Sequence, residues 1–163
     1  HEPYPALAVD RYWNLVSANA MIAPFLAGVA PSLLTPPLNV MRLSFHPQGL
    51  APLTVNLAEW CGHLLERLHR QCEATADPVL IALYEELKTY PIPARKAPHT
   101  VGADSLAVPY KIRMGNNVLS FISTTMVFGT PLDVTLSELA LETFFPADEL
   151  TTETMRSLAK SLT

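Results

Sequence analysis

The stretch that decides the fold is residues 106–128, which read LAVPYKIRMGNNVLSFISTTMVF. Apolar and polar residues alternate over 106–114, and this period of two is typical of a strand with one buried face. Gly115-Asn116-Asn117 then predicts a turn. The β-branched run over 118–128 predicts a long second strand. The second half of the chain is therefore expected to contain an antiparallel strand pair.

A third strand and a terminal helix follow this pair. Residues 133–144 carry the apolar pattern of a strand, and a change of phase indicates a β-bulge near Ser137-Glu138. Pro146 is expected to end the strand, because proline cannot donate a ladder hydrogen bond. Residues 148–162 predict an amphipathic helix.

The first residues of the chain predict a β-hairpin and a short helix. Apolar residues alternate over 5–10 and again over 13–19, as in two paired strands. Asn19 then begins a short apolar helix over 20–26. Gly28 and Pro31 are expected to end that helix.

Three longer helices are predicted next. Thr35 is expected to cap the first of them, and the His46-Pro47 pair ends it. The strongest helical pattern covers 54–74, with one broad apolar arc opposite a polar face. Asp77-Pro78 opens the third helix as a capping carboxylate followed by proline.

The predicted order is two strands, four helices, three strands and a final helix, with 90–103 as a loop. This is the order of an α+β, PAS-like fold: a five-stranded antiparallel sheet with a helical insert between strands two and three covering one face. The first strand is expected in the centre, beside the fifth. The space between sheet and helices commonly becomes a ligand cavity in such a topology. The chain length is that of one domain over 1–163.

Composition excludes several classes of protein. Hydrophobic residues make up 49% of the chain and charged residues 16%, which excludes a disordered chain. The net charge of -4 makes this chain alone a poor DNA binder. No apolar run is long enough for a membrane span, and two cysteines without CxxC spacing suit a reducing cytoplasm. Because the chain begins with His1, we expect it to be a piece of a longer protein.

Four segments, in order along the chain, together resemble one family. They read PYPALAVDR from residue 3 with WNLV and AN following, NVMRLSFHPQGL from 39, NLAEW from 56, and FISTTMVFGTPLDVTLSEL from 121. These four segments are similar to the signature sequences of the MmyB-like ligand-binding domain.

The resemblance implies a bacterial transcription regulator of the Xre type. Its N-terminal helix-turn-helix domain, absent here, would supply the DNA contact. The resemblance also implies a PAS-like fold and a fatty-acid-like ligand held in the hydrophobic interior. We further expect a cytoplasmic homodimer that needs no cofactor.

Histidine and cysteine residues offer little catalytic chemistry. Glu59, His63 and Glu66 share a helical face and could in principle chelate a cation, but such pairs are ordinary decoration of an exposed helix. Cys61 and Cys72 lie close to the apolar arc, which favours buried small hydrophobes over a redox sensor. No glycine-rich phosphate loop or hydrolase nucleophile motif is present, and we expect no enzymatic activity.

A channel for an acyl chain would be lined by apolar side chains, with a polar group at one end. An apolar side chain at each candidate position is more often plain core than pocket lining. Arg42 is the candidate cation for a ligand carboxylate, with a plain surface arginine as the alternative. Hydroxyl groups of Ser123-Thr124-Thr125 could also face a pocket. The predicted ligand-binding residues are Met41, Arg42, Phe45, Trp60, Leu64, Leu68, Leu80, Leu83, Ile112, Leu119, Phe121 and Leu139.

Two functions therefore remain open from the sequence. The first is a sensory domain that binds a hydrophobic effector. The second is a structural module that dimerises the regulator, with its interior filled by side chains.

Overall fold

The computed structural model describes residues 1–94, 108–127 and 139–162. The bulge expected near Ser137-Glu138 and most of the predicted loop lie outside the described residues. So do Leu106 at the start of one predicted strand and Phe128 at the end of the next.

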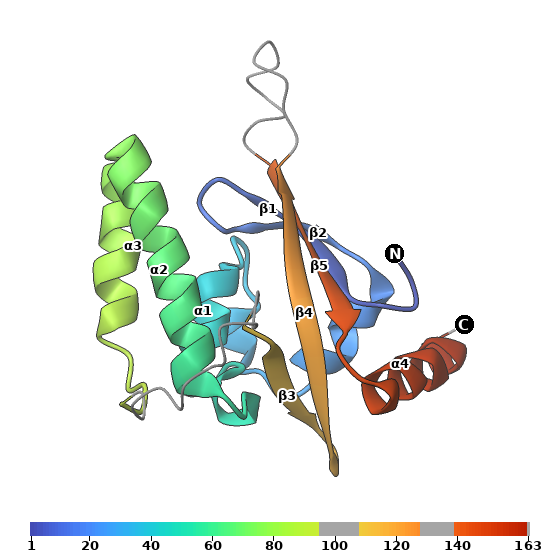
Figure 1. The fold of residues 1–163 in the computed structure, drawn as a ribbon. Helices are drawn as coiled ribbons and strands as arrows, with labels where there is room; N and C mark the ends of the chain where they lie inside the picture. Colours follow the sequence, from blue (N-terminus) through green and yellow to red (C-terminus); the bar gives the residue numbers. More distant parts are fainter. Residues whose placement is uncertain (95–107, 128–138, 163) are drawn as a thin grey trace, which may run out of the picture.

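Five strands form one antiparallel sheet with the order β2-β1-β5-β4-β3 (Figure 1). The predicted α+β fold and the place of β1 inside the sheet, beside β5, are thereby confirmed. Alternate residues of a strand face opposite sides, so each strand has one face toward the helical insert. The strands are β1 (Ala6–Asp10), β2 (Leu15–Ala18), β3 (Tyr110–Met114), β4 (Asn117–Val127) and β5 (Leu139–Pro146).

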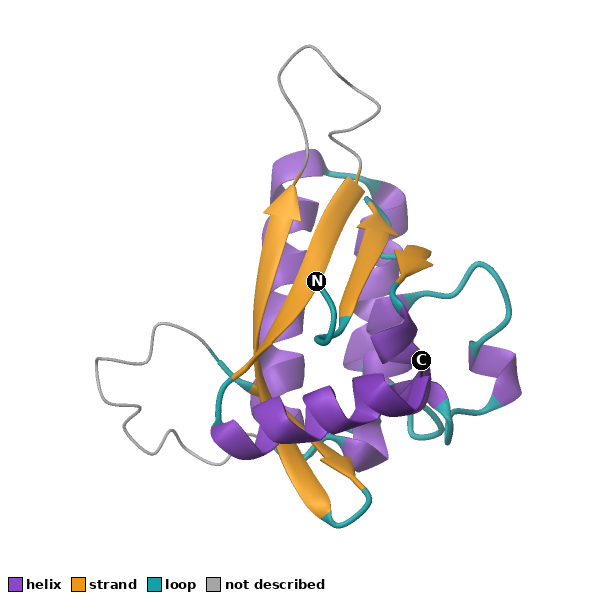
Figure 2. Ribbon diagram, turned by 90° about the vertical axis from the view of Figure 1, so that its right-hand side faces the viewer, coloured by secondary structure: helices purple, strands orange, loops and turns teal. Residues whose placement is uncertain are grey.

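The helical insert between β2 and β3 packs on one side of the sheet, and α4 (Glu149–Leu162) lies on the other (Figures 1 and 2). Asp148 caps α4, because its Oδ1 accepts a hydrogen bond of 2.8 Å from the amide of Thr151. The insert contains the short 3-10 helices η1 (Ala20–Leu26), η2 (Pro31–Leu33) and η3 (Ala51–Leu53), and the α-helices α1 (Val40–Phe45), α2 (Leu57–Thr75) and α3 (Pro78–Lys88).

The expected cap of α1 was wrong. Asn39, not Thr35, caps this helix, and its Oδ1 accepts from the amides of Met41 and Arg42 at 3.2 Å. The helix cannot start earlier, because Leu38 accepts a backbone hydrogen bond from Leu15 at 2.7 Å and is tied to the hairpin. The side chain of Asn39 also donates to the carbonyl of Tyr12 at 2.8 Å, which fixes α1 against the hairpin turn.

The strongest predicted helix begins later than expected for a similar reason. Thr54 forms an isolated bridge with Ile112, and the side chain of Asn56 accepts from the amide of Lys111 at 3.0 Å. Residues 54–56 therefore pair with the edge of β3, and α2 starts at Leu57.

Two predicted strands were too long. Val108 and Pro109 lie outside β3, and the carbonyl of Pro109 accepts from the Asn56 side chain at 2.8 Å. Trp13 is not part of β2, because it adopts a left-handed conformation with φ of 67° in the turn of the hairpin. This turn directs the buried indole of Trp13 toward α2, where its Nε1 donates to Gln71 at 2.9 Å.

The core lies between the insert and the sheet. Trp60 of α2 is 5% exposed and packs on Tyr110 of β3, with ring centroids 4.7 Å apart. Fully buried Phe45, Leu68 and Leu119 join α1, α2 and β4 in the same cluster. The apolar arc predicted for the helix over 54–74 therefore faces the core, as expected.

We expect Trp60→Ala to lower the free energy of unfolding by about 3–5 kcal/mol, because it removes a buried indole and leaves a cavity. Urea unfolding followed by circular dichroism measures this loss. Val79→Ala, at an exposed position of α3, should change the stability by less than about 0.5 kcal/mol. A loss below about 1 kcal/mol for Trp60→Ala would show that the indole is not part of the core.

Candidate functional site

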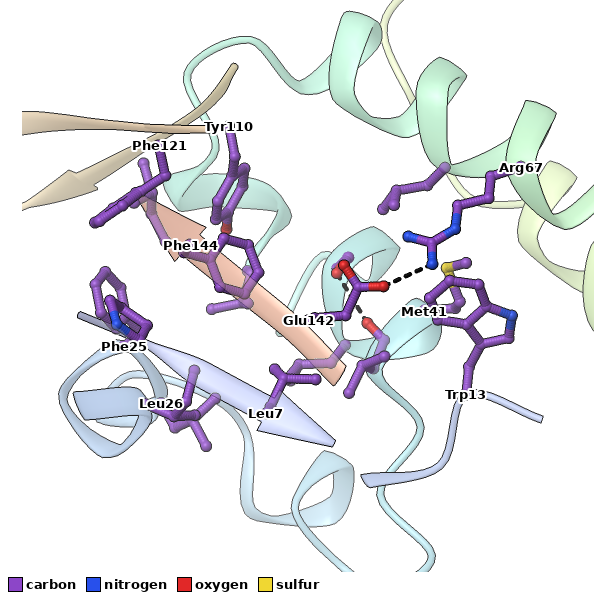
Figure 3. A pocket seen from close by; sticks show the side chains of 18 residues that line it. Leu7, Trp13, Phe25, Leu26, Met41, Arg67, Tyr110, Phe121, Glu142 and Phe144 are labelled. Atoms are coloured by element: carbon purple, nitrogen blue, oxygen red, sulfur yellow. Dashed lines mark hydrogen bonds and ion pairs between the residues drawn. The ribbon is translucent and has the colours of Figure 1, made fainter. Parts of the chain in front are cut away.

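A cavity of about 110 Å³ lies between the sheet and the insert (Figure 3). Its walls come from β1, β3, β4 and β5 on one side, and from η1, α1 and α2 on the other. Most of its lining is apolar. The lining residues are Pro5, Leu7, Trp13, Ile22, Phe25, Leu26, Val40, Met41, Leu43, Ser44, Leu50, Leu64, Arg67, Tyr110, Ile112, Phe121, Glu142 and Phe144.

Aromatic rings form much of the sheet side of this cavity. Phe121 of β4 lies edge-on to Phe144 of β5, with ring centroids 6.3 Å apart, and to Phe25 of η1 at 6.0 Å. Tyr110 of β3 lies 6.2 Å from Phe144. Such rings are large and rigid, so the cavity has a firm floor on the sheet.

The described lining contains one ion pair. Arg67 of α2 donates from Nη2 to Oε1 of Glu142 on β5 at 2.6 Å. The side chain of Glu142 is 8% exposed and that of Arg67 is 25% exposed. Figure 3 shows the two side chains meeting at the edge of the cavity, near Trp13. The pair therefore joins the insert to the sheet across the cavity.

Neighbouring side chains hold both members of the pair. The guanidinium of Arg67 lies 4.5 Å from the ring centroid of Trp13, as in a cation–π contact. Thr125, which faces Glu142 across the β4–β5 pair, donates its hydroxyl to Oε1 of Glu142 at 2.8 Å. One hydroxyl of the Ser123-Thr124-Thr125 run thus supports a cavity residue without lining the cavity itself.

The remaining polar side chains of the described lining are uncharged. Ser44 donates its hydroxyl to the carbonyl of Val40 at 2.8 Å, within its own helix. Burial raises the pKa of Tyr110 to about 12, so its phenol is neutral at ordinary pH. Its oxygen accepts a long hydrogen bond of 3.5 Å from Thr54.

Four predicted ligand-binding residues line this cavity: Met41, Leu64, Ile112 and Phe121. Six others are buried in the core outside it, namely Phe45, Trp60, Leu68, Leu80, Leu83 and Leu119. Leu139 lines a separate pocket that also includes Arg67 and Val127. A ligand role for any of these residues remains a prediction.

Arg42 lies outside the cavity, at the position of a surface arginine. Its guanidinium makes two hydrogen bonds of 2.7 Å to the carboxylate of Glu86 on α3, and its side chain is 44% exposed. The polar group at the cavity edge is instead the Arg67–Glu142 pair, which the sequence reasoning missed.

The sequence held a weak signal for Arg67 and almost none for Glu142. At 100° per residue, Arg67 lies about 20° from Trp60, at the border of the apolar arc of α2. A charge at that border can reach the space beside the core. Glu142 lies in a segment with apolar residues on both faces of the strand. The alternation of apolar and polar residues therefore does not tell which face carries the side chain of Glu142.

Burial governs the titration of His63 and Cys61. Burial lowers the pKa of His63, which stacks on Trp60 at 5.7 Å. Burial also raises the pKa of the Cys61 thiol to about 12. The described residues include no group of three metal-ligating side chains.

The comparison with known families gives one result. A family model described as the MmyB-like transcription regulator ligand binding domain matches residues 1–158. No curated protein matches the chain. In the part of the chain that the structure describes, no helix is long and apolar enough to cross a membrane.

We expect Glu86→Gln to cost less than about 1 kcal/mol at neutral pH, because exposed ion pairs contribute little. The hydrogen bonds from Arg42 hold the pKa of Glu86 below its ordinary value of 4.5. The contribution of the pair is therefore present above that ordinary pKa and is lost as the pH falls through the lower folded pKa.

Urea unfolding of wild type and Glu86→Gln, at neutral pH and in acid, measures this contribution. The difference in unfolding free energy should shrink in acid. A difference above about 2 kcal/mol, or one that grows in acid, would contradict the placement of Arg42–Glu86 on the surface.

Proposed function

This chain belongs to the family of MmyB-like transcription regulator ligand binding domains, and we propose from this premise that its cavity receives a fatty-acid-like effector. The domain then acts as the non-enzymatic sensory part of a cytoplasmic bacterial regulator. A separate helix-turn-helix domain contacts the DNA, which is consistent with the net charge of -4 on this chain.

The observation that carries the proposal is the apolar cavity between the sheet and the insert. An empty apolar cavity of about 150 Å³ is known to bind benzene, and this one has about 110 Å³. It therefore has room for part of an alkyl chain. A longer chain needs one wall to move.

The wall best suited to move is η1. It is a short 3-10 helix with Pro24 inside it and no side-chain cap, so few hydrogen bonds within the helix resist a shift of its later residues. Its start is anchored, because the side chain of Asn19 bonds to Ala6 and Tyr4. Its residues Ile22, Phe25 and Leu26 line the cavity but are only half-buried. When an alkyl chain enters, η1 would exchange its contacts with the sheet for contacts with the ligand.

A second candidate function, a structural dimerisation module without a ligand, is favoured by the outer face of the sheet. Ile122 and Phe145 lie opposite one another in the β4–β5 pair and are 41% and 44% exposed, and Met126 on the same face is 50% exposed. Figure 2 shows α4 crossing only part of this face. Exposed apolar surface of this kind is typical of protein contacts.

Affinity for fatty acids should rise with chain length. Each buried methylene contributes about 0.8 kcal/mol, or about fourfold in affinity, until the cavity is full. Calorimetric titration with the series from hexanoate to tetradecanoate measures this slope. An affinity that does not change along the series would contradict an interior site for the chain.

Leu26→Trp should reduce this affinity about tenfold or more, because the larger ring fills the cavity from η1. Ile81→Trp is the matched control, since Ile81 is 43% exposed on α3 and does not line the cavity. Equal effects of the two variants would place the binding site elsewhere.

The dimerisation alternative is tested by sedimentation of this chain. If the outer face holds two copies together, wild type sediments as a dimer and Ile122→Ser/Met126→Ser as a monomer with unchanged circular dichroism. A monomeric wild type would remove this alternative.

Native mass spectrometry of the freshly purified domain separates the two functions. A co-purified lipid supports the sensory domain with a hydrophobic effector, whereas a dimer that takes up no lipid supports the structural dimerisation module.

A further inference from the structure

The charges in the cavity wall already neutralise one another. Arg67 and Glu142 are the charged side chains of the described lining, and they contact each other at 2.6 Å. His63, on the same helix as Arg67, adds no positive charge at neutral pH because burial lowers its pKa. The described lining of the cavity therefore offers no uncompensated cation to an anionic ligand.

Glu142 cannot readily give up its place to a ligand carboxylate. Its side chain is buried, it accepts from Thr125 at 2.8 Å, and its partner Arg67 is held against Trp13. A carboxylate entering beside Arg67 would place a second negative charge next to Glu142. Two like charges at a desolvated site are strongly unfavourable.

An uncharged head group avoids this conflict. A hydroxyl or an amide can donate to the carboxylate of Glu142 and accept from the guanidinium of Arg67, so all three groups remain hydrogen-bonded. The net charge of the filled cavity stays at zero.

We propose that Glu142 makes this cavity select amphiphiles with an uncharged head group, such as an alcohol or a primary amide, over the free acid of the same chain length. This inference rests on the proposed function and narrows it. The effector is fatty-acid-like in its chain but carries a neutral head.

Three ligands with eight carbons test the head group at constant chain length: 1-octanol, octanamide and octanoate. Calorimetry at neutral pH, where octanoate is ionised, should show that wild type binds octanol and octanamide roughly tenfold or more tighter than octanoate. Glu142→Gln keeps the shape of the side chain but removes its charge. In this variant the preference should disappear or reverse in favour of octanoate, which then finds Arg67 uncompensated.

Two further variants complete the experiment. Glu86→Gln is the matched control, because it removes a carboxylate from an ion pair outside the cavity and should leave the preference unchanged. Arg67→Gln should increase the preference for octanol, since Glu142 then stands without its cation. This opposite shift tests the inference even if Glu142→Gln does not fold.

The outcomes separate this inference from the proposed function. If wild type binds all three ligands but prefers octanoate or binds them equally, the selection by Glu142 is wrong and the alkyl-chain site stands. The same holds if neither Glu142→Gln nor Arg67→Gln alters the preference. If wild type binds none of the three, the proposed function fails and the inference fails with it.

Discussion

The ion pair between Arg67 and Glu142 is the constraint on which the cavity depends. It joins α2 to β5 at the cavity edge, with Glu142 almost fully buried. A buried ion pair need not add stability, because desolvation of the two charges offsets their attraction. Its effect here is on geometry: it fixes the distance between insert and sheet. The left-handed turn at Trp13 contributes by placing the indole against the guanidinium.

The cavity persists because rigid groups surround it. Rings of Tyr110, Phe121 and Phe144 stand on the sheet and cannot collapse into the space as flexible aliphatic chains would. On the insert side, α1 is fixed by the hydrogen bonds of Asn39 to the hairpin. η1 is held at its start, where the side chain of Asn19 bonds to Ala6 and Tyr4, but Pro24 lies inside it and no side chain caps it. The same arrangement thus provides a firm floor and one wall that can yield.

The order of elements could be predicted from the sequence because it depends on local periodicity and on the residues that begin and end helices and strands. The apolar arc of α2 and the Asp77-Pro78 start of α3 are signals within one segment. The predicted bounds were wrong where a segment forms hydrogen bonds with residues far away in the sequence. For example, the side chain of Asn56 bonds to residues at the edge of β3, and α2 begins only after it. The cavity residues Arg67 and Glu142 meet only in the folded chain, across 75 residues of sequence, and no local pattern joins them. Arg42 attracted attention because it is a charge on an apolar helix, yet its partner Glu86 lies on the surface of α3.

The central claim is that an alkyl chain enters the space between sheet and insert. Nuclear Overhauser effects between the protons of bound 1-octanol and the methyl groups of the isotope-labelled domain test it most directly. The account predicts contacts with Leu7, Leu26 and Leu64, which line the cavity. Contacts confined to Ile122 and Met126, on the exposed outer face of the sheet, would contradict it.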